Sequence, residues 1–207
     1  VRRVLAAVLD RYGSRFSFSG LSRDIELNHV TTESYLELLE ESFIGLVLYA
    51  YDFSRKSPKW RGEKKVYFLD PFVFHAVRSF LTGEPLQDAG PETLQDEALL
   101  GRLVEGIVVA HLARHREIPW LQPARTFLWM YYDRGGRELD ALYGVEDRFV
   151  GFEVKYGASA GVKKIRPVGP ISKLLVLTRS DVHFGEDLWA IPVDIFLALL
   201  EPSDRNL

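Results

Sequence analysis

Two alternating runs of residues, 138–144 and 149–157, constrain the fold more than any other part of this sequence. Apolar and polar residues take turns along each run, and the residues VEDR lie between the two runs. Because successive side chains of a β-strand point to opposite faces of a sheet, this pattern predicts two neighbouring strands joined by a short turn. One face of the predicted hairpin is aromatic and aliphatic, so we expect that face to pack against helices.

The opposite face of the predicted hairpin carries charges. In the second strand Phe152 and Val154 point one way, whereas Glu153 and Lys155 point the other way. In the first strand the alternation places Asp140 on the charged side. Two carboxylates on neighbouring strands repel each other unless a cation or a proton lies between them. Asp140 and Glu153 are therefore candidate ligands of a divalent cation.

A magnesium ion needs only one or two protein carboxylates, because water and phosphate oxygens complete its coordination shell. With Mg²⁺ or Mn²⁺ bound, Lys155 could orient an attacking water or neutralise developing charge. Glu105 is a further candidate ligand, because it interrupts the apolar stripe of a long predicted helix, where an ionised carboxylate is costly unless it is paired or coordinated. The alternatives are a solvated sheet face for Glu153 and Lys155, and an arginine as the partner of Glu105.

The first 83 residues predict a winged-helix-like domain. Three short helical patterns precede two β-rich runs, 43–53 and 64–70, and residues 55–65 would be the wing. The candidate nucleic-acid contacts on this wing are Arg55, Lys56, Lys59, Arg61, Lys64 and Lys65. The third predicted helix is acidic, which argues against reading of the major groove, so a protein-binding role stays open.

The polar stretch 84–93 contains two prolines and a glycine and is the predicted linker to a second domain, 94–207. In that domain a long helix precedes three strands, a lysine-rich segment, a fourth strand and a last helix, so the fold class is α+β or α/β. The lysine-rich segment supplies Lys163, Lys164 and Arg166 as further candidate phosphate contacts, with an ordinary solvated turn as the alternative.

His111 and His115, one helical turn apart, could chelate a metal, but a solvated helix end is the more ordinary interpretation. Composition adds limits. The chain of 207 residues has a net charge of −3 and no cysteine, which excludes disulfides and thiolate zinc sites. It has no apolar run near the roughly 20 residues that a membrane span requires, so we expect a cytoplasmic protein with no membrane contact. The first residue is Val1, and we expect the chain to be cut from a longer protein.

The order Glu105, Asp140, Glu153, Lys155 resembles the PD-(D/E)XK nuclease superfamily, whose core is αβββαβ. The whole chain resembles the C-terminal region of bacterial and archaeal AAA-type ATPases of the DUF4143 group, in which a P-loop ATPase domain precedes a winged helix and a nuclease-like domain. The matching segments are TTESYLELLEESFIGLVLYAYD, KKVYFLDPFV, LLGRLVEGIVVAHL, GGRELDALY and FEVKYG.

The resemblance implies a metal-dependent nuclease that uses Glu105, Asp140 and Glu153 as ligands and acts on nucleic acid, DNA rather than RNA. It also implies the missing ATPase domain, where ATP would bind, as a partner, and a homo-oligomer is a further expectation. Two positions depart from the family pattern: Gly106 replaces a frequent asparagine, and Tyr156 replaces the usual serine. The alternative is a catalytically inactive module that binds nucleic acid or protein under the control of the ATPase part.

Overall fold

The computed structural model describes residues 1–116, 124–145, 148–157 and 170–200. They form a mixed α+β protein with two compact units. Unit 1 comprises Val1–Tyr49 and Lys59–Ala110, and unit 2 comprises Ala50–Pro58 and His111–Leu207. Among the described residues, no helix has the length and apolar character needed to cross a bilayer.

Unit 1 begins with three short helices, as the sequence predicts. They are α1 (Arg2–Asp10), α2 (Phe18–Asp24) and α3 (His29–Glu41). The helix α3 begins after Asn28, because the side chain of Asn28 accepts a hydrogen bond from the backbone N–H of Thr31 at 2.8 Å. Leu36 of α3 is fully buried, whereas Leu38 is half exposed.

A two-stranded antiparallel sheet follows the helices. Its strands are β1 (Gly45–Tyr49) and β4 (Lys64–Phe68), paired from Gly45↔Phe68 to Tyr49↔Lys64. Every residue of both strands is buried, because the sheet is covered by helices and by the segment 12–16 that bridges to β4. The predicted element order, three helices and then a hairpin, is confirmed for this unit.

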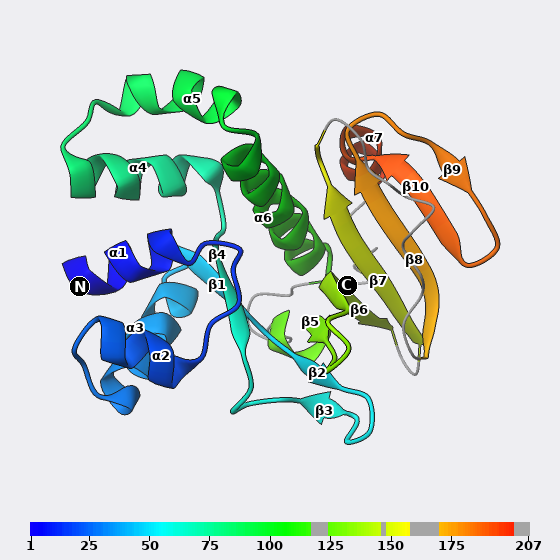
Figure 1. Ribbon diagram of the computed structural model, residues 1–207, viewed down its shortest axis with the longest axis horizontal. Coiled ribbons are helices and arrows are strands. Elements are labelled where there is room, and N and C mark those ends of the chain that lie inside the picture. Colours follow the sequence, from blue (N-terminus) through cyan, green and yellow to red (C-terminus); the bar gives the residue numbers. More distant parts are fainter. Residues whose placement is uncertain (117–123, 146–147, 158–169, 201–207) are drawn as a thin grey trace, which may run out of the picture. The chain divides into compact units, whose positions relative to one another are not determined.

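The remaining helices of unit 1 are α4 (Pro71–Thr82), α5 (Leu86–Gln95) and α6 (Glu97–Arg116), the last of which continues into unit 2. Pro71 lies in the first turn of α4, where proline is favoured, and Asp70 caps that helix. In Figure 1, α4 lies between α1 and α5. Most of the predicted linker 84–93 is helical, because it forms the larger part of α5, and this helix contains Pro91.

Unit 2 is built on a mixed six-stranded sheet with the order β5-β6-β7-β8-β10-β9 (Figure 1). The strands are β5 (Leu128–Tyr132), β6 (Glu138–Val145), β7 (Arg148–Lys155), β8 (Ile171–Thr178), β9 (His183–Phe184) and β10 (Leu188–Pro192). The first three strands form an antiparallel meander, and β8 runs parallel to β7. A 3-10 turn, η1 (Ala124–Thr126), precedes the sheet, and α7 (Val193–Leu199) follows it.

The predicted hairpin and the later strand are therefore confirmed, whereas the sequence analysis missed β9 and β10. Phe152 of β7 contacts Phe196 of α7, with ring centroids 5.6 Å apart, so one face of the sheet is covered by the last helix. The opposite side of the neighbouring strands contains a core of Leu139, Leu174, Val176 and Ala190.

The predicted wing, residues 55–65, is divided between the two units. Residues 59–65 belong to unit 1, whereas the short ribbon of β2 (Tyr51–Asp52) and β3 (Ser57–Pro58) belongs to unit 2. Tyr51 contacts Trp129 and Phe149, with ring centroids 4.6 and 5.1 Å apart. Phe53 packs between Tyr131 and Phe149. Aromatic burial thus binds this ribbon to the six-stranded sheet.

Candidate functional site

The predicted carboxylate site lies where β6 and β7 stop pairing regularly. The pairs run from Val145↔Arg148 to Ala141↔Phe152, and Asp140 follows immediately. The side-chain Oδ2 of Asp140 accepts a hydrogen bond from the backbone N–H of Val154 at 2.8 Å. Asp140 is buried, with 8 % of its surface exposed. Its carboxylate is therefore held against the Glu153–Val154–Lys155 stretch of β7.

A β-bulge places Asp140 in this position. On the other side of β6, Trp129 pairs with Leu142 and Tyr131 pairs with Leu139, so Asp140 and Ala141 lie together opposite Met130 of β5. Such a bulge breaks the alternation of side chains and turns one of them in a new direction. Leu139 consequently lies beside Gly151, on the face of the sheet where strict alternation placed Asp140.

Glu153 and Lys155 form an ion pair on β7. Their Oε1 and Nζ atoms are 2.5 Å apart, and the two side chains are 12 % and 43 % exposed. Glu153 is thus largely enclosed, which is unlike the freely solvated sheet face that was the alternative interpretation. Lys155 is the more accessible of the two side chains.

Glu105 lies in unit 1, on α6, and is paired within that unit. Its Oε1 accepts hydrogen bonds from Lys65 Nζ at 2.8 Å and from Tyr67 OH at 2.5 Å. The Lys65 and Glu105 side chains are only 4 % and 12 % exposed. This arrangement agrees with the alternative interpretation, in which Glu105 is paired with a cation, but the partner is a lysine of β4 and not an arginine. Because Asp140 and Glu153 belong to unit 2, a site shared with Glu105 stays a prediction.

Gly106, which departs from the family pattern, has a packing reason. A Cβ atom at this position would lie 1.9 Å from the hydroxyl oxygen of Tyr12. Tyr12 is itself fully buried, and burial is the main cause that raises the pKa of its phenol, with the negative charge of Glu105 adding to the effect. The larger asparagine of the family pattern would not fit beside Tyr12.

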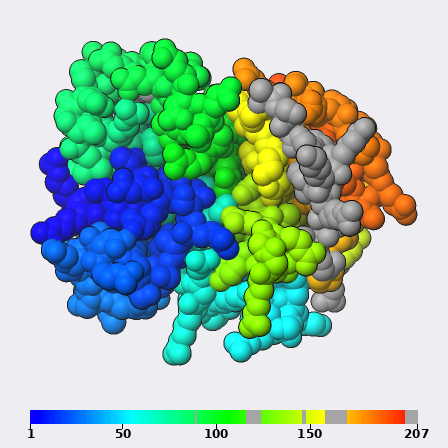
Figure 2. Space-filling view, viewed as in Figure 1, coloured from blue at the N-terminus to red at the C-terminus, as the bar shows by residue number. Residues whose placement is uncertain are grey.

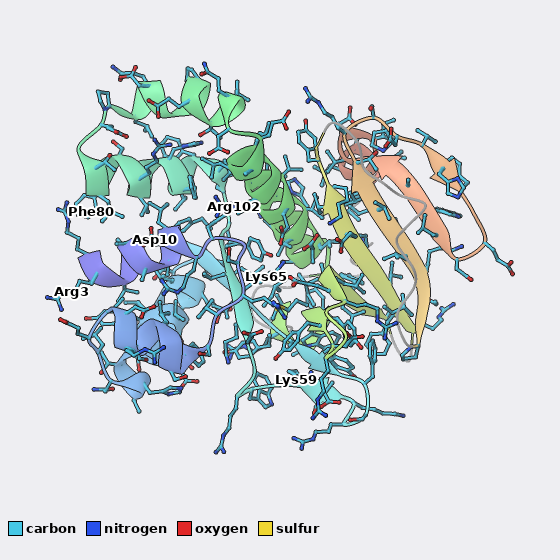
Figure 3. The ribbon with its side chains drawn as sticks, in the orientation of Figure 1. Arg3, Asp10, Lys59, Lys65, Phe80 and Arg102 are labelled. Carbon is cyan, nitrogen blue, oxygen red and sulfur yellow. The ribbon has the colours of Figure 1, made fainter. Side chains whose placement is uncertain are left out.

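Two of the predicted nucleic-acid contacts, Lys64 and Lys65, are buried. Lys64 is 1 % exposed and donates to the carbonyl oxygens of Trp60 and Gly62 at 2.8 and 2.7 Å. Its ammonium also lies 4.2 Å from the ring centre of Phe18. Lys65, which is labelled in Figure 3, pairs with Glu105. In the sequence, Lys64 and Lys65 look like two more cations of an exposed basic run. In the structure they are buried, because they belong to β4, in which every residue is buried.

The rest of the basic run divides between the units. Arg55 and Lys56 are exposed at the turn of the β2–β3 ribbon, which the side chain of Asp52 stabilises. Lys59 and Arg61 belong to unit 1. The predicted contacts Lys163, Lys164 and Arg166 lie outside the described residues.

The two histidines of the long helix do not stand out as a metal site. His115 Nδ1 lies 2.9 Å from Tyr143 OH of β6, so this ring is engaged by the sheet rather than solvated. Within the part of the chain that the structure describes, no group of three or more histidine, aspartate or glutamate side chains is arranged to hold a metal ion.

Two surface features of unit 1 escaped the sequence analysis. An apolar pocket of about 460 Å³ is lined by α4, α5 and α6, with Leu94 and His75 among its residues. Phe43, just after α3, is exposed and has a positive φ angle of 55°. The only sequence signal for the latter was a helix end without glycine or asparagine.

The fold and the strand site define a mixed α+β protein with an acidic pair and a lysine at neighbouring strands. Comparison with family models assigns its parts. Residues 100–196 match the model "Domain of unknown function (DUF4143)", so this stretch is a DUF4143 region, and that part of the resemblance is confirmed. Residues 1–84 match the model "Domain of unknown function (DUF8612)". No curated protein matches the chain, and no solved structure matches it.

Proposed function

We propose that unit 2 is a nuclease-like domain in which Asp140 and Glu153 bind a divalent cation and Lys155 binds a phosphate of nucleic acid. The observation that carries this proposal is the hydrogen bond from Val154 N–H to Asp140, formed at a β-bulge, beside the Glu153–Lys155 ion pair. Bulges often turn a side chain toward an active site. Two enclosed carboxylates on adjacent strands also have an electrostatic cost that a cation would relieve.

The donor set suits Mg²⁺ or Mn²⁺. Asp140 and Glu153 offer hard carboxylate oxygens, which both ions prefer, and two such residues are enough when water and phosphate complete the shell. When bound, the ion would polarise a phosphodiester and supply the hydrolytic chemistry. The role of Val154 N–H is to fix the orientation of the Asp140 carboxylate.

In this proposal Lys155 changes its contact from Glu153 to a phosphate group. Its ammonium now contacts Glu153 Oε1. A cation beside Glu153 would replace that contact, and the half-exposed ammonium would then turn to a phosphate oxygen. Glu105 is the third ligand implied by the resemblance, and its pairing with Lys65 makes it the weakest member of the proposed set.

The wider assignment rests on the resemblance and on element order. We propose that the chain is the C-terminal part of a AAA-type ATPase, with a winged helix in unit 1 and a PD-(D/E)XK-like core in unit 2. The three helices followed by the β1–β4 hairpin, and the α6-β5-β6-β7 order continued by β8, support it. The DUF4143 match over 100–196 supports it as well.

Calorimetric titration with Mn²⁺ tests the site. The wild-type chain should bind with saturation, and the Asp140→Asn, Glu153→Gln double variant should lose the binding heat, because both proposed ligands lose their charge. Glu138→Gln, which removes a carboxylate from the same strand as Asp140, is the matched control and should bind as the wild type does. Equal heats in the double variant and the wild type would refute the site.

The second candidate is a non-catalytic binding module. Unit 1 favours it, since α3 presents acidic and apolar side chains to solvent where a DNA reader would present cations. This module could coexist with the nuclease-like site, because the two candidate functions use different units.

A further inference from the structure

The C-terminal end of α3 closes in a Schellman motif. The N–H of Ile44 bonds to the carbonyl of Leu39, and the N–H of Phe43 bonds to the carbonyl of Glu40, both at 3.0 Å. Phe43 therefore occupies the position that follows the helix cap, with a φ of 55°. Glycine is the usual residue there, because a side chain at positive φ is crowded by its own backbone.

An aromatic residue at this position is costly, and here it is not hidden. The side chain of Phe43 is 58 % exposed. Glu26 takes the same position after α2, where Glu26 N–H bonds to Arg23 O and Leu27 N–H bonds to Ser22 O. The chain thus contains two helix ends of the same geometry, one with a polar residue and one with an exposed phenylalanine. Burial in the core does not account for Phe43.

The exposed face of α3 leads to Phe43. Val30, Ser34, Glu37, Leu38 and Glu41 share one side of the helix, because they follow each other at intervals of three or four residues. All five are exposed, including Val30 at 72 % and Leu38 at 51 %. The other side of the helix faces the core through Thr32 and Leu36. In Figure 2, α3 forms part of the light-blue surface of unit 1.

This face combines apolar groups with negative charge. Val30, Leu38 and Phe43 are each more than half exposed and offer apolar area to a partner. Glu37 and Glu41 lie among them. Carboxylates repel a phosphate backbone, so nucleic acid is a poor occupant. They attract lysine and arginine, and complementary charge steers a partner onto an apolar contact.

We propose that this α3 face, defined as Val30, Ser34, Glu37, Leu38, Glu41 and Phe43, is a docking surface for a basic amphipathic helix of a protein partner. Phe43 is its aromatic anchor, placed beyond the end of the helix so that the ring reaches into the apolar side of the partner. Glu37 and Glu41 would pair with cations beside that apolar side. The proposal does not depend on the metal site of unit 2.

A synthetic peptide helix with leucine on one face and lysine on the other is a suitable probe, and its binding to the whole chain can be followed by NMR. The expected shifts fall on α3 and Phe43. Phe43→Gly should weaken binding roughly tenfold, while the thermal midpoint stays the same or rises because glycine suits the positive φ. Glu26→Gly makes the same backbone change at the end of α2 and should leave peptide binding unchanged.

Charge is tested separately. The double variant Glu37→Gln, Glu41→Gln should also weaken binding of the peptide, and a peptide with glutamate in place of lysine should not bind. The proposal is overturned if the lysine peptide leaves the α3 resonances unshifted, if Phe43→Gly binds as tightly as the wild type, or if a DNA duplex shifts the same face instead.

Discussion

The ammonium group of Lys64 is enclosed by carbonyl oxygens and by the rings of Phe18 and Tyr49. Burial lowers its pKa from 10.5 to about 8, and the negative charge of Glu33 partly opposes this change. The residue is therefore structural and titrates in an accessible range.

This pKa predicts a pH dependence of stability. Between pH 8 and 10.5 the unfolded chain retains the Lys64 proton that the folded chain releases. The free energy of unfolding should therefore rise with pH over this range and level off below pH 8. Chemical denaturation of the wild type and of Lys64→Met checks this, since the slope attributable to Lys64 is absent from the variant. The same slope in both proteins would mean that Lys64 keeps its ordinary pKa when folded.

At the scale of elements, the Lys65–Glu105 ion pair joins β4 to α6. Variants of this pair test whether the role of Glu105 is structural. Removing one member of a buried ion pair leaves the other charge without compensation and commonly costs about 3–5 kcal/mol. We expect Lys65→Met to lose about 3 kcal/mol of stability. The double variant Lys65→Met, Glu105→Gln should regain much of that loss, because it leaves no buried charge.

Denaturation of the two single variants and the double variant measures this coupling. Strictly additive losses would contradict a structural pair. A Glu105→Gln variant that still binds Mn²⁺ with wild-type heat would place Glu105 outside the metal site altogether.

The elements themselves could largely be predicted from sequence, because periodicity and capping are local. The alternating runs 138–144 and 149–157 correspond to β6 and β7. The bulge at Asp140 could not be predicted, since it depends on how β5 aligns with β6 across a turn. The burial of Lys64 and Lys65 was missed for a similar reason: it depends on elements distant in sequence that cover β4.

At the scale of the whole chain, the predicted linker 84–93 begins at the last residue of the first family match, 1–84, and ends before the second, 100–196. The compact units divide the chain differently, because Ala50–Pro58 belongs to unit 2. The predicted domain boundaries stay a prediction. The assignment of Ala50–Pro58 to unit 2 follows from aromatic packing: Tyr51 contacts Trp129 and Phe149, and a pattern of local periodicity does not reveal these contacts.

This packing predicts that Tyr51→Ala will weaken unit 2. Loss of a buried aromatic ring typically costs about 3–5 kcal/mol, so hydrogen exchange should accelerate at the amides of β5, Leu128–Tyr132. Phe184→Ala, which removes an exposed ring from the same unit, is the control and should change little. Faster exchange confined to β1 and β4 would instead assign the ribbon to unit 1.

The most direct test of the proposed metal site is to locate Mn²⁺ on the chain by the paramagnetic broadening of backbone amide signals. We expect substoichiometric Mn²⁺ to broaden the amides of Asp140, Glu153 and Val154 selectively, and we expect the Asp140→Asn, Glu153→Gln variant to lose this effect. Broadening centred on other residues, or equal broadening in that variant, would contradict the proposal that the β6–β7 carboxylates bind the cation.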